Sequence, residues 1–95
     1  MLRNNSVLKD NFIASLSPNP ITRPGQVQLK FNAERKGEMH VSAFNSGGQL
    51  VLKTKMVAFY GLNSGHLHIF YLAKGTYNII FNLAGKKEIK KVVTV

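Results

Sequence analysis

A regular alternation of large apolar residues with other residues, late in the chain, constrains the possible fold most. Tyr77, Ile79 and Phe81 are each two positions apart, so on a β-strand their side chains point to one face. Gly75 precedes them and can take a positive φ without a Cβ penalty. A strand that buries three such side chains needs a second sheet packed against it. Residues 72–81 therefore predict a turn followed by the central strand of a β-sandwich.

Other segments repeat this pattern between turn signals. Val27, Leu29 and Phe31 give the clearest example, with polar residues between them. The predicted strands are residues 12–17, 26–32, 39–44, 49–53, 66–71, the strand within the element 72–81, and 89–95. Turns rich in glycine, proline and asparagine separate most of them, and no helical period is present. About seven such strands predict an all-β fold, an immunoglobulin-like antiparallel β-sandwich.

The segment 54–63 and the two ends of the chain are less regular. Residues 54–63 could form a strand or a covering loop; we expect them to continue the preceding strand, with Gly61 and Gly65 bracketing a turn before residues 66–71. A further turn is expected near residues 84–87. Residues 1–10 are polar and lack a period, which is typical of a linker or of the end of an upstream region. Residues 11–95 then form one domain.

The charge of the chain bears on its partners. Thirteen Lys and Arg against four Asp and Glu give a formal charge of +9, which attracts nucleic acid, acidic polysaccharide or lipid headgroups. A group of lysines lies near the C-terminus: Lys86, Lys87, Lys90 and Lys91. Lys53 and Lys55 would share one strand face. A solvated face is the favoured interpretation, and a dedicated anion site is the alternative. No apolar run approaches the ~20 residues of a membrane helix.

Residues for catalysis or for holding a metal are few. Asp10 is the only aspartate and cysteine is absent, so neither a catalytic triad nor a thiolate metal site can be built. We therefore expect no enzyme activity and no cofactor. His66 and His68 would share one strand face, and His40 on a neighbouring strand would complete a three-histidine zinc site. A polar outer face is favoured, because no carboxylate stands nearby to orient the imidazoles.

Two binding functions also have to be considered. A nucleic-acid module needs aromatic residues interleaved with basic ones on a sheet face. Phe44, Phe70 and Tyr71 are the candidates, but none lies in such a motif, so nucleic acid is not the favoured partner. An accessory β-sandwich of a secreted enzyme, which binds carbohydrate or another surface ligand, remains the alternative to the interpretation that follows.

The turn motifs taken together resemble a known family. An opening strand ends in Pro18-Asn19-Pro20, and Leu72, Gly75 and Tyr77 form a Leu-x-x-Gly-x-Tyr motif. The hairpin between them carries a further set of matching residues: Met39, Val41, Ala43, Phe44, Asn45, Gly48 and Val51. The last motif, Lys90-Lys91-Val92-Val93, lies close to the end of the sequence. In this order, the motifs are similar to those of the C-terminal sorting domains of cargo proteins that the type IX (Por) secretion system of Bacteroidetes exports.

The resemblance implies a non-catalytic sorting signal on an immunoglobulin-like sandwich, with residues 11–95 as the sorting domain and residues 1–10 as the end of an upstream cargo region. Its partners would be the outer-membrane translocon and a sortase-like cysteine peptidase. The peptidase would cleave before about Asn11 and couple the cargo to anionic lipopolysaccharide. The cargo would pass through the periplasm to the outer membrane, cell surface or extracellular space.

Within this interpretation, we expect the translocon to recognise the end of the chain, and we call the recognised surface the address. We expect residues 86–95, together with the turn at residues 75–77, to form part of the surface that the translocon reads. The last strand would lie at a sheet edge, which would allow strand addition by a receptor or dimers by sheet extension. For Gly75 and Tyr77 a purely structural role is favoured: glycine for turn geometry and tyrosine for core packing.

Overall fold

The computed structural model describes residues 12–17, 26–68 and 73–94 of the chain. Within these ranges it contains seven strands and no helix, and so no helix that could cross a membrane. The strands are β1 (Ile13–Ser17), β2 (Gln26–Ala33), β3 (Gly37–Phe44), β4 (Leu50–Ala58), β5 (Gly61–His68), β6 (Gly75–Leu83) and β7 (Lys86–Thr94).

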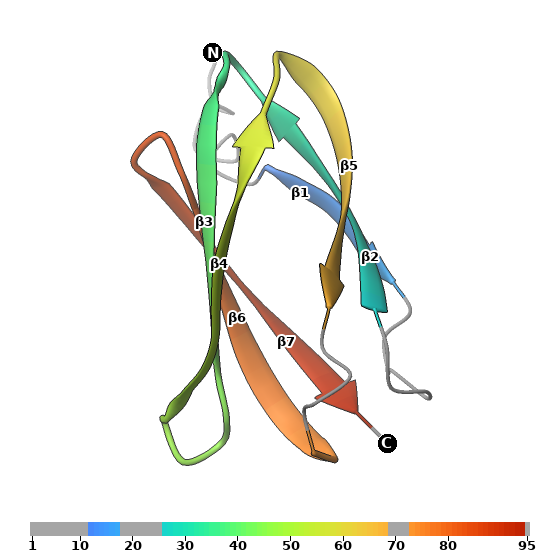
Figure 1. The fold of residues 1–95 in the computed structure, drawn as a ribbon, viewed down its shortest axis with the longest axis vertical. Coiled ribbons are helices and arrows are strands. Elements are labelled where there is room, and N and C mark those ends of the chain that lie inside the picture. Colours follow the sequence, from blue (N-terminus) through green and yellow to red (C-terminus); the bar gives the residue numbers. More distant parts are fainter. Residues whose placement is uncertain (1–11, 18–25, 69–72, 95) are drawn as a thin grey trace, which may run out of the picture.

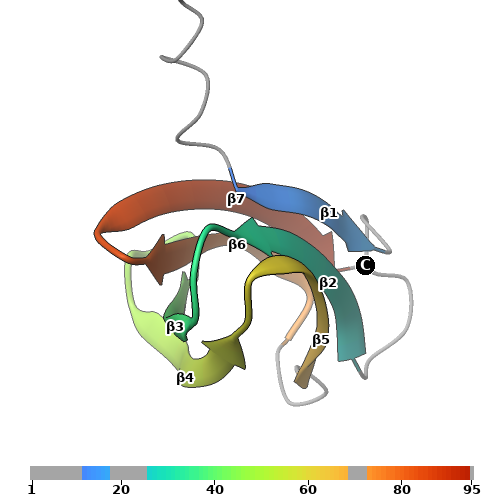
Figure 2. The same ribbon diagram turned by 90° about the horizontal axis from the view of Figure 1, so that it is seen from above.

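The strands form two sheets packed face to face (Figures 1 and 2). The smaller sheet has the order β1-β2-β5 and the larger one β4-β3-β6-β7, and all neighbouring strands are antiparallel. The chain changes sheet after β2, after β4 and after β5. The prediction of an all-β, antiparallel sandwich with about seven strands is confirmed.

Strand β6 is an interior strand of the larger sheet, with β3 on one side and β7 on the other. Tyr77, Ile79 and Phe81 point into the sandwich and are buried, as their spacing predicts. Val41 of β3 lies directly opposite Phe81. The rest of the core comes from the inward faces of both sheets and includes Val27, Leu29, Phe31, Met39, Ala43, Ala58, Leu67, Leu83 and Val92. Alternation in β2, β3 and β6 therefore places one face of each strand in a shared core.

The segment 54–63 is partly as expected. Residues 54–58 do continue β4, but the predicted turn between Gly61 and Gly65 is wrong, because both glycines belong to β5. Gly65 lies opposite Leu29 of β2 on the inward face. A Cβ there would lie 3.1 Å from the Met56 sulfur, so this glycine makes room for a side chain of β4. The inward placement of Ile69 falls outside the described residues.

The β6–β7 turn lies at Ala84 and Gly85, within the predicted segment 84–87. Their φ angles are +54° and +82°, so the two-residue loop has the left-handed conformation at both central positions that favours Asn-Gly in hairpins. Glycine adopts this conformation without strain, but alanine does so at a cost of about 1 kcal/mol. The turn therefore stores local strain at Ala84.

Replacing Ala84 by asparagine is expected to raise the free energy of unfolding by about 0.5–1 kcal/mol, because asparagine tolerates the left-handed conformation better. Urea denaturation followed by circular dichroism measures the change. Gly85→Ala is the matched control and should lower stability by a similar amount. An Ala84→Asn variant no more stable than the unaltered chain would contradict this description of the turn.

Candidate recognition surface

Strand β7 is the last strand in the order of the larger sheet and pairs with β6 along its whole length. Its even-numbered residues stand opposite the inward residues of β6: Glu88 faces Phe81, Lys90 faces Ile79 and Val92 faces Tyr77. The odd-numbered residues therefore point outward. We call these four residues the outer row of β7: Lys87, Ile89, Lys91 and Val93.

Between Lys86 and Val92, the inward residues of β7 are either buried or paired with a glutamate at the rim of the sandwich. Val92 is only 1% exposed. Lys86 and Lys90 reach the rim of the sandwich, where each pairs with a glutamate: Lys86 Nζ lies 3.4 Å from Glu34 Oε2, and Lys90 Nζ lies 3.1 Å from Glu88 Oε2. By contrast, Ile89 in the outer row is 57% exposed. Of the predicted basic residues, Lys87 and Lys91 thus share an outer face with an exposed apolar side chain.

Glu88 is the one buried charged residue within the described part of the chain. Its Oε1 accepts hydrogen bonds from the backbone N–H groups of Phe12 and Ile13, at 2.8 and 3.0 Å. The pairing of β1 with β2 is irregular between Ile13 and Ser15, and the carboxylate takes two donors at this point. Glu88 therefore ties the start of β1 in one sheet to β7 in the other. Sequence reasoning missed this role, because a glutamate among lysines usually indicates a solvated position.

Gly75 and Tyr77 lie beside the C-terminal end of β7. Gly75 has a φ of +151° and lies opposite Thr94. The hydroxyl of the buried Tyr77 donates to the Ala73 carbonyl at 2.6 Å, and the Thr94 hydroxyl donates to the same oxygen at 2.8 Å. Both motif residues thus shape the turn before β6. Leu72 of the same motif lies outside the described residues.

Removing the Tyr77 hydroxyl tests this arrangement. Tyr77→Phe is expected to lower the free energy of unfolding by about 1 kcal/mol, because the ring stays packed while one hydrogen bond is lost. Thermal unfolding of the two proteins under the same conditions measures the difference. A Phe variant as stable as the parent would show that the bond to Ala73 contributes nothing.

The hairpin motif is also structural. Asn45 Oδ1 accepts from the N–H groups of Gly47 and Gln49 at 3.0 and 2.9 Å, and Asn45 Nδ2 donates to Gln49 Oε1 at 3.0 Å. Gly48 has a φ of +83° and donates its N–H to the Asn45 carbonyl. These contacts close the loop between β3 and β4. Pro18, Asn19 and Pro20 of the first motif lie outside the described residues.

The three histidines do not converge. His40 lies on β3 of the larger sheet, whereas His66 and His68 lie on β5 of the smaller one. The predicted neighbouring strand for His40 is therefore wrong, since β5 pairs with β2. Within the described ranges no cluster of three metal-ligating side chains occurs. Lys53 and Lys55 are exposed together on the outer side of β4, as expected.

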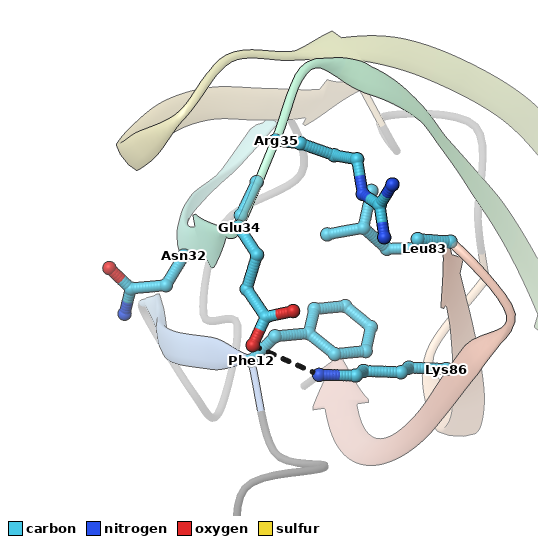
Figure 3. A pocket seen from close by; sticks show the side chains of 8 residues that line it. Phe12, Asn32, Glu34, Arg35, Leu83 and Lys86 are labelled. Atoms are coloured by element: carbon cyan, nitrogen blue, oxygen red, sulfur yellow. Dashed lines mark ion pairs between the residues drawn. The ribbon is translucent and has the colours of Figure 1, made fainter.

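A small hollow lies where β1 begins, beside the β2–β3 connection and the β6–β7 turn (Figure 3). Phe12 and Leu83 form its apolar part, Arg35 reaches over it, and the Glu34–Lys86 ion pair lies at its side. Its volume of about 190 Å³ is below the range of ligand pockets, about 300–1,000 Å³. The surface of β7 is therefore the better candidate for recognition.

Comparison with protein families shows that residues 15–95 match the family model of the secretion system C-terminal sorting domain. The chain belongs to this family. Membership makes it a C-terminal signal of type IX secretion, and implies an upstream cargo domain, interaction with the secretion machinery, and export to the outer membrane or cell surface. Domains of this family are in general non-catalytic. No curated protein and no solved structure shows significant similarity to the chain.

The described motif residues of this sorting domain divide into two groups. Asn45, Gly48, Gly75, Tyr77 and Val92 hold turns or fill the core. Such residues serve the fold and can do so without touching a receptor. The basic residues of β7 form the second group, and of these Lys87 and Lys91 are exposed.

Proposed function

We propose that the translocon recognises the sorting domain through the outer row of β7. The observation that carries this proposal is the pairing register of β7, which turns Lys87, Ile89 and Lys91 to the outer face of the terminal strand. Two lysines flank an isoleucine that is 57% exposed. Such a row offers a receptor both an apolar contact and charge, and contacts that combine the two give a binding site its specificity.

We further propose that the cargo is separated from the domain after export. A sortase-like peptidase would cleave in the polar sequence that ends at about Asn11 and couple the cargo to anionic lipopolysaccharide. The anchoring of Phe12 and Ile13 by Glu88 supports this position. A peptidase needs a chain that can enter its active site, and residues tied into a sandwich cannot do so. The cleavable sequence would thus end where this anchor begins.

The test is to append residues 1–95 to a reporter that already carries a periplasmic export signal, in a bacterium with a type IX system. The reporter should reach the cell surface or the medium, and mass spectrometry should place its new C-terminus before Phe12. The same fusion in a strain without the translocon should remain in the periplasm. Retention in both strains would refute the sorting role. Export with the domain still attached would refute only the cleavage.

A further inference from the structure

The β4–β5 connection carries an unusual concentration of exposed apolar side chains. Four residues within six positions are more than half exposed, and we call them the aromatic tip: Val57 (52%), Phe59 (57%), Tyr60 (81%) and Leu62 (64%). Val57 points outward from the larger sheet and Leu62 outward from the smaller one. The tip therefore wraps one end of the sandwich, at the top of Figure 1. Exposed apolar patches of this kind mark interaction sites.

The backbone of the tip is held in a defined shape. Asn63 Oδ1 accepts from the Phe59 N–H at 2.9 Å, while Asn63 Nδ2 donates to the carbonyls of Phe59 and Gly61 at 2.8 and 3.0 Å. Gly61 has a φ of +97°, which allows the chain to turn directly from one sheet into the other. One side chain thus fixes the connection and leaves both aromatic rings in solvent. The exposure of Phe59 and Tyr60 follows from an ordered local structure.

Basic residues surround the tip. The Lys36 ammonium lies 5.7 Å from the centre of the Phe59 ring, and Arg35 is exposed beside it in the same connection. Lys55 lies on the same outer face as Val57. The two glutamates at this end, Glu34 and Glu38, lie near Lys86 and Lys55 at 3.4 and 3.6 Å. Cations therefore outnumber acids around the apolar side chains.

We propose that the aromatic tip docks on an anionic lipid surface. Because the tip lies at one end of the sandwich, it can approach a flat, deformable layer. Tyrosine is favoured at the level of the headgroups, and phenylalanine and leucine can enter the acyl region below them. Lysine and arginine around the tip match the negative charge of the headgroups. This inference stands without the proposed sorting function, because it needs neither a translocon nor a cargo.

The test uses the full chain and sedimentation with lipid vesicles. Vesicles in which about one third of the lipid is phosphatidylglycerol should bind the protein about tenfold more strongly than purely zwitterionic vesicles. The variant Phe59→Ser/Tyr60→Ser should bind the anionic vesicles about tenfold less than the parent. Lys36→Glu should also bind more weakly, with the difference shrinking as salt is added.

The matched control is Leu50→Ser, compared with the single tip variant Phe59→Ser: the two residues are similarly exposed, at 52% and 57%, but Leu50 lies outside the tip. The control should bind as the parent does. Equal losses in the control and the tip variant would overturn the proposal and indicate general attraction. Absence of parent binding to anionic vesicles would also overturn it and point to a protein partner for the tip. Circular dichroism checks that each variant is folded.

Discussion

Glu88→Ala is expected to lower the free energy of unfolding by about 3 kcal/mol. The Phe12 and Ile13 N–H groups would lose a charged acceptor in a place that water does not easily reach, and buried donors without partners are costly. Phe12 is 6% exposed, Ile13 8% and Glu88 8%. Urea denaturation measures the loss. Amide hydrogen exchange at Phe12 and Ile13 should also become much faster, since these are the donors that are released.

Two control variants separate the parts of this interaction. Glu88→Gln keeps an amide oxygen for the two N–H groups and should lose less, about 1–2 kcal/mol. Lys90→Ala removes the lysine side chain, which is 42% exposed, but leaves the carboxylate and its two backbone donors in place, and should lose under about 1 kcal/mol. If Glu88→Ala proved as stable as Lys90→Ala, the carboxylate would not be the tie between β1 and β7.

Phe81→Ala is expected to cost about 3–5 kcal/mol, the range for a large aromatic side chain removed from a packed core. Phe81 is completely buried on β6, the strand that lies between β3 and β7. Domains of this size are stable by only about 5–10 kcal/mol. The variant should therefore unfold at much lower temperature, and its cargo should be exported less because less of the domain is folded.

Phe59→Ala is the matched control, since it makes the same chemical change at a residue that is 57% exposed. It should change stability by less than about 1 kcal/mol. Calorimetry of both variants gives the comparison directly. Similar losses at the two positions would contradict the assignment of the core.

The sequence predicted those strands whose two faces differ clearly. In β2, β3 and β6 one alternate set is mostly apolar and the other mostly polar, and the apolar set is buried. In strand β7 either face could be the buried one, because each alternate set contains both apolar and charged residues. Ile89 and Val93 lie on one face, and Val92 lies on the other. A shift by one residue would exchange the two faces. The structure buries Val92 and Glu88. That choice depends on β1, which supplies donors for the carboxylate, and so depends on a contact between distant segments.

The connection between β4 and β5 was predicted poorly for a related reason. Gly65 resembles a turn residue in the sequence, but it lies in a strand because Met56 needs the space above it. Phe59 and Tyr60 resemble core residues, but Asn63 holds them outside. For the candidate site, the motifs predicted the family and the basic strand. They could not show that Val92 is buried while Lys87 and Lys91 point outward, since the choice between the two faces of β7 depends on how the two sheets pack.

Export of a reporter fused to the domain, compared between two charge-reversed variants, tests the proposed address most directly. Lys87→Glu/Lys91→Glu changes the outer row of β7, and Lys30→Glu/Lys53→Glu makes the same change at exposed lysines on β2 and β4. Circular dichroism should show that both domains are folded. We predict that the β7 variant stays in the periplasm while the control reaches the surface as the parent does. Normal export of a folded β7 variant would contradict a role for the outer row as the address.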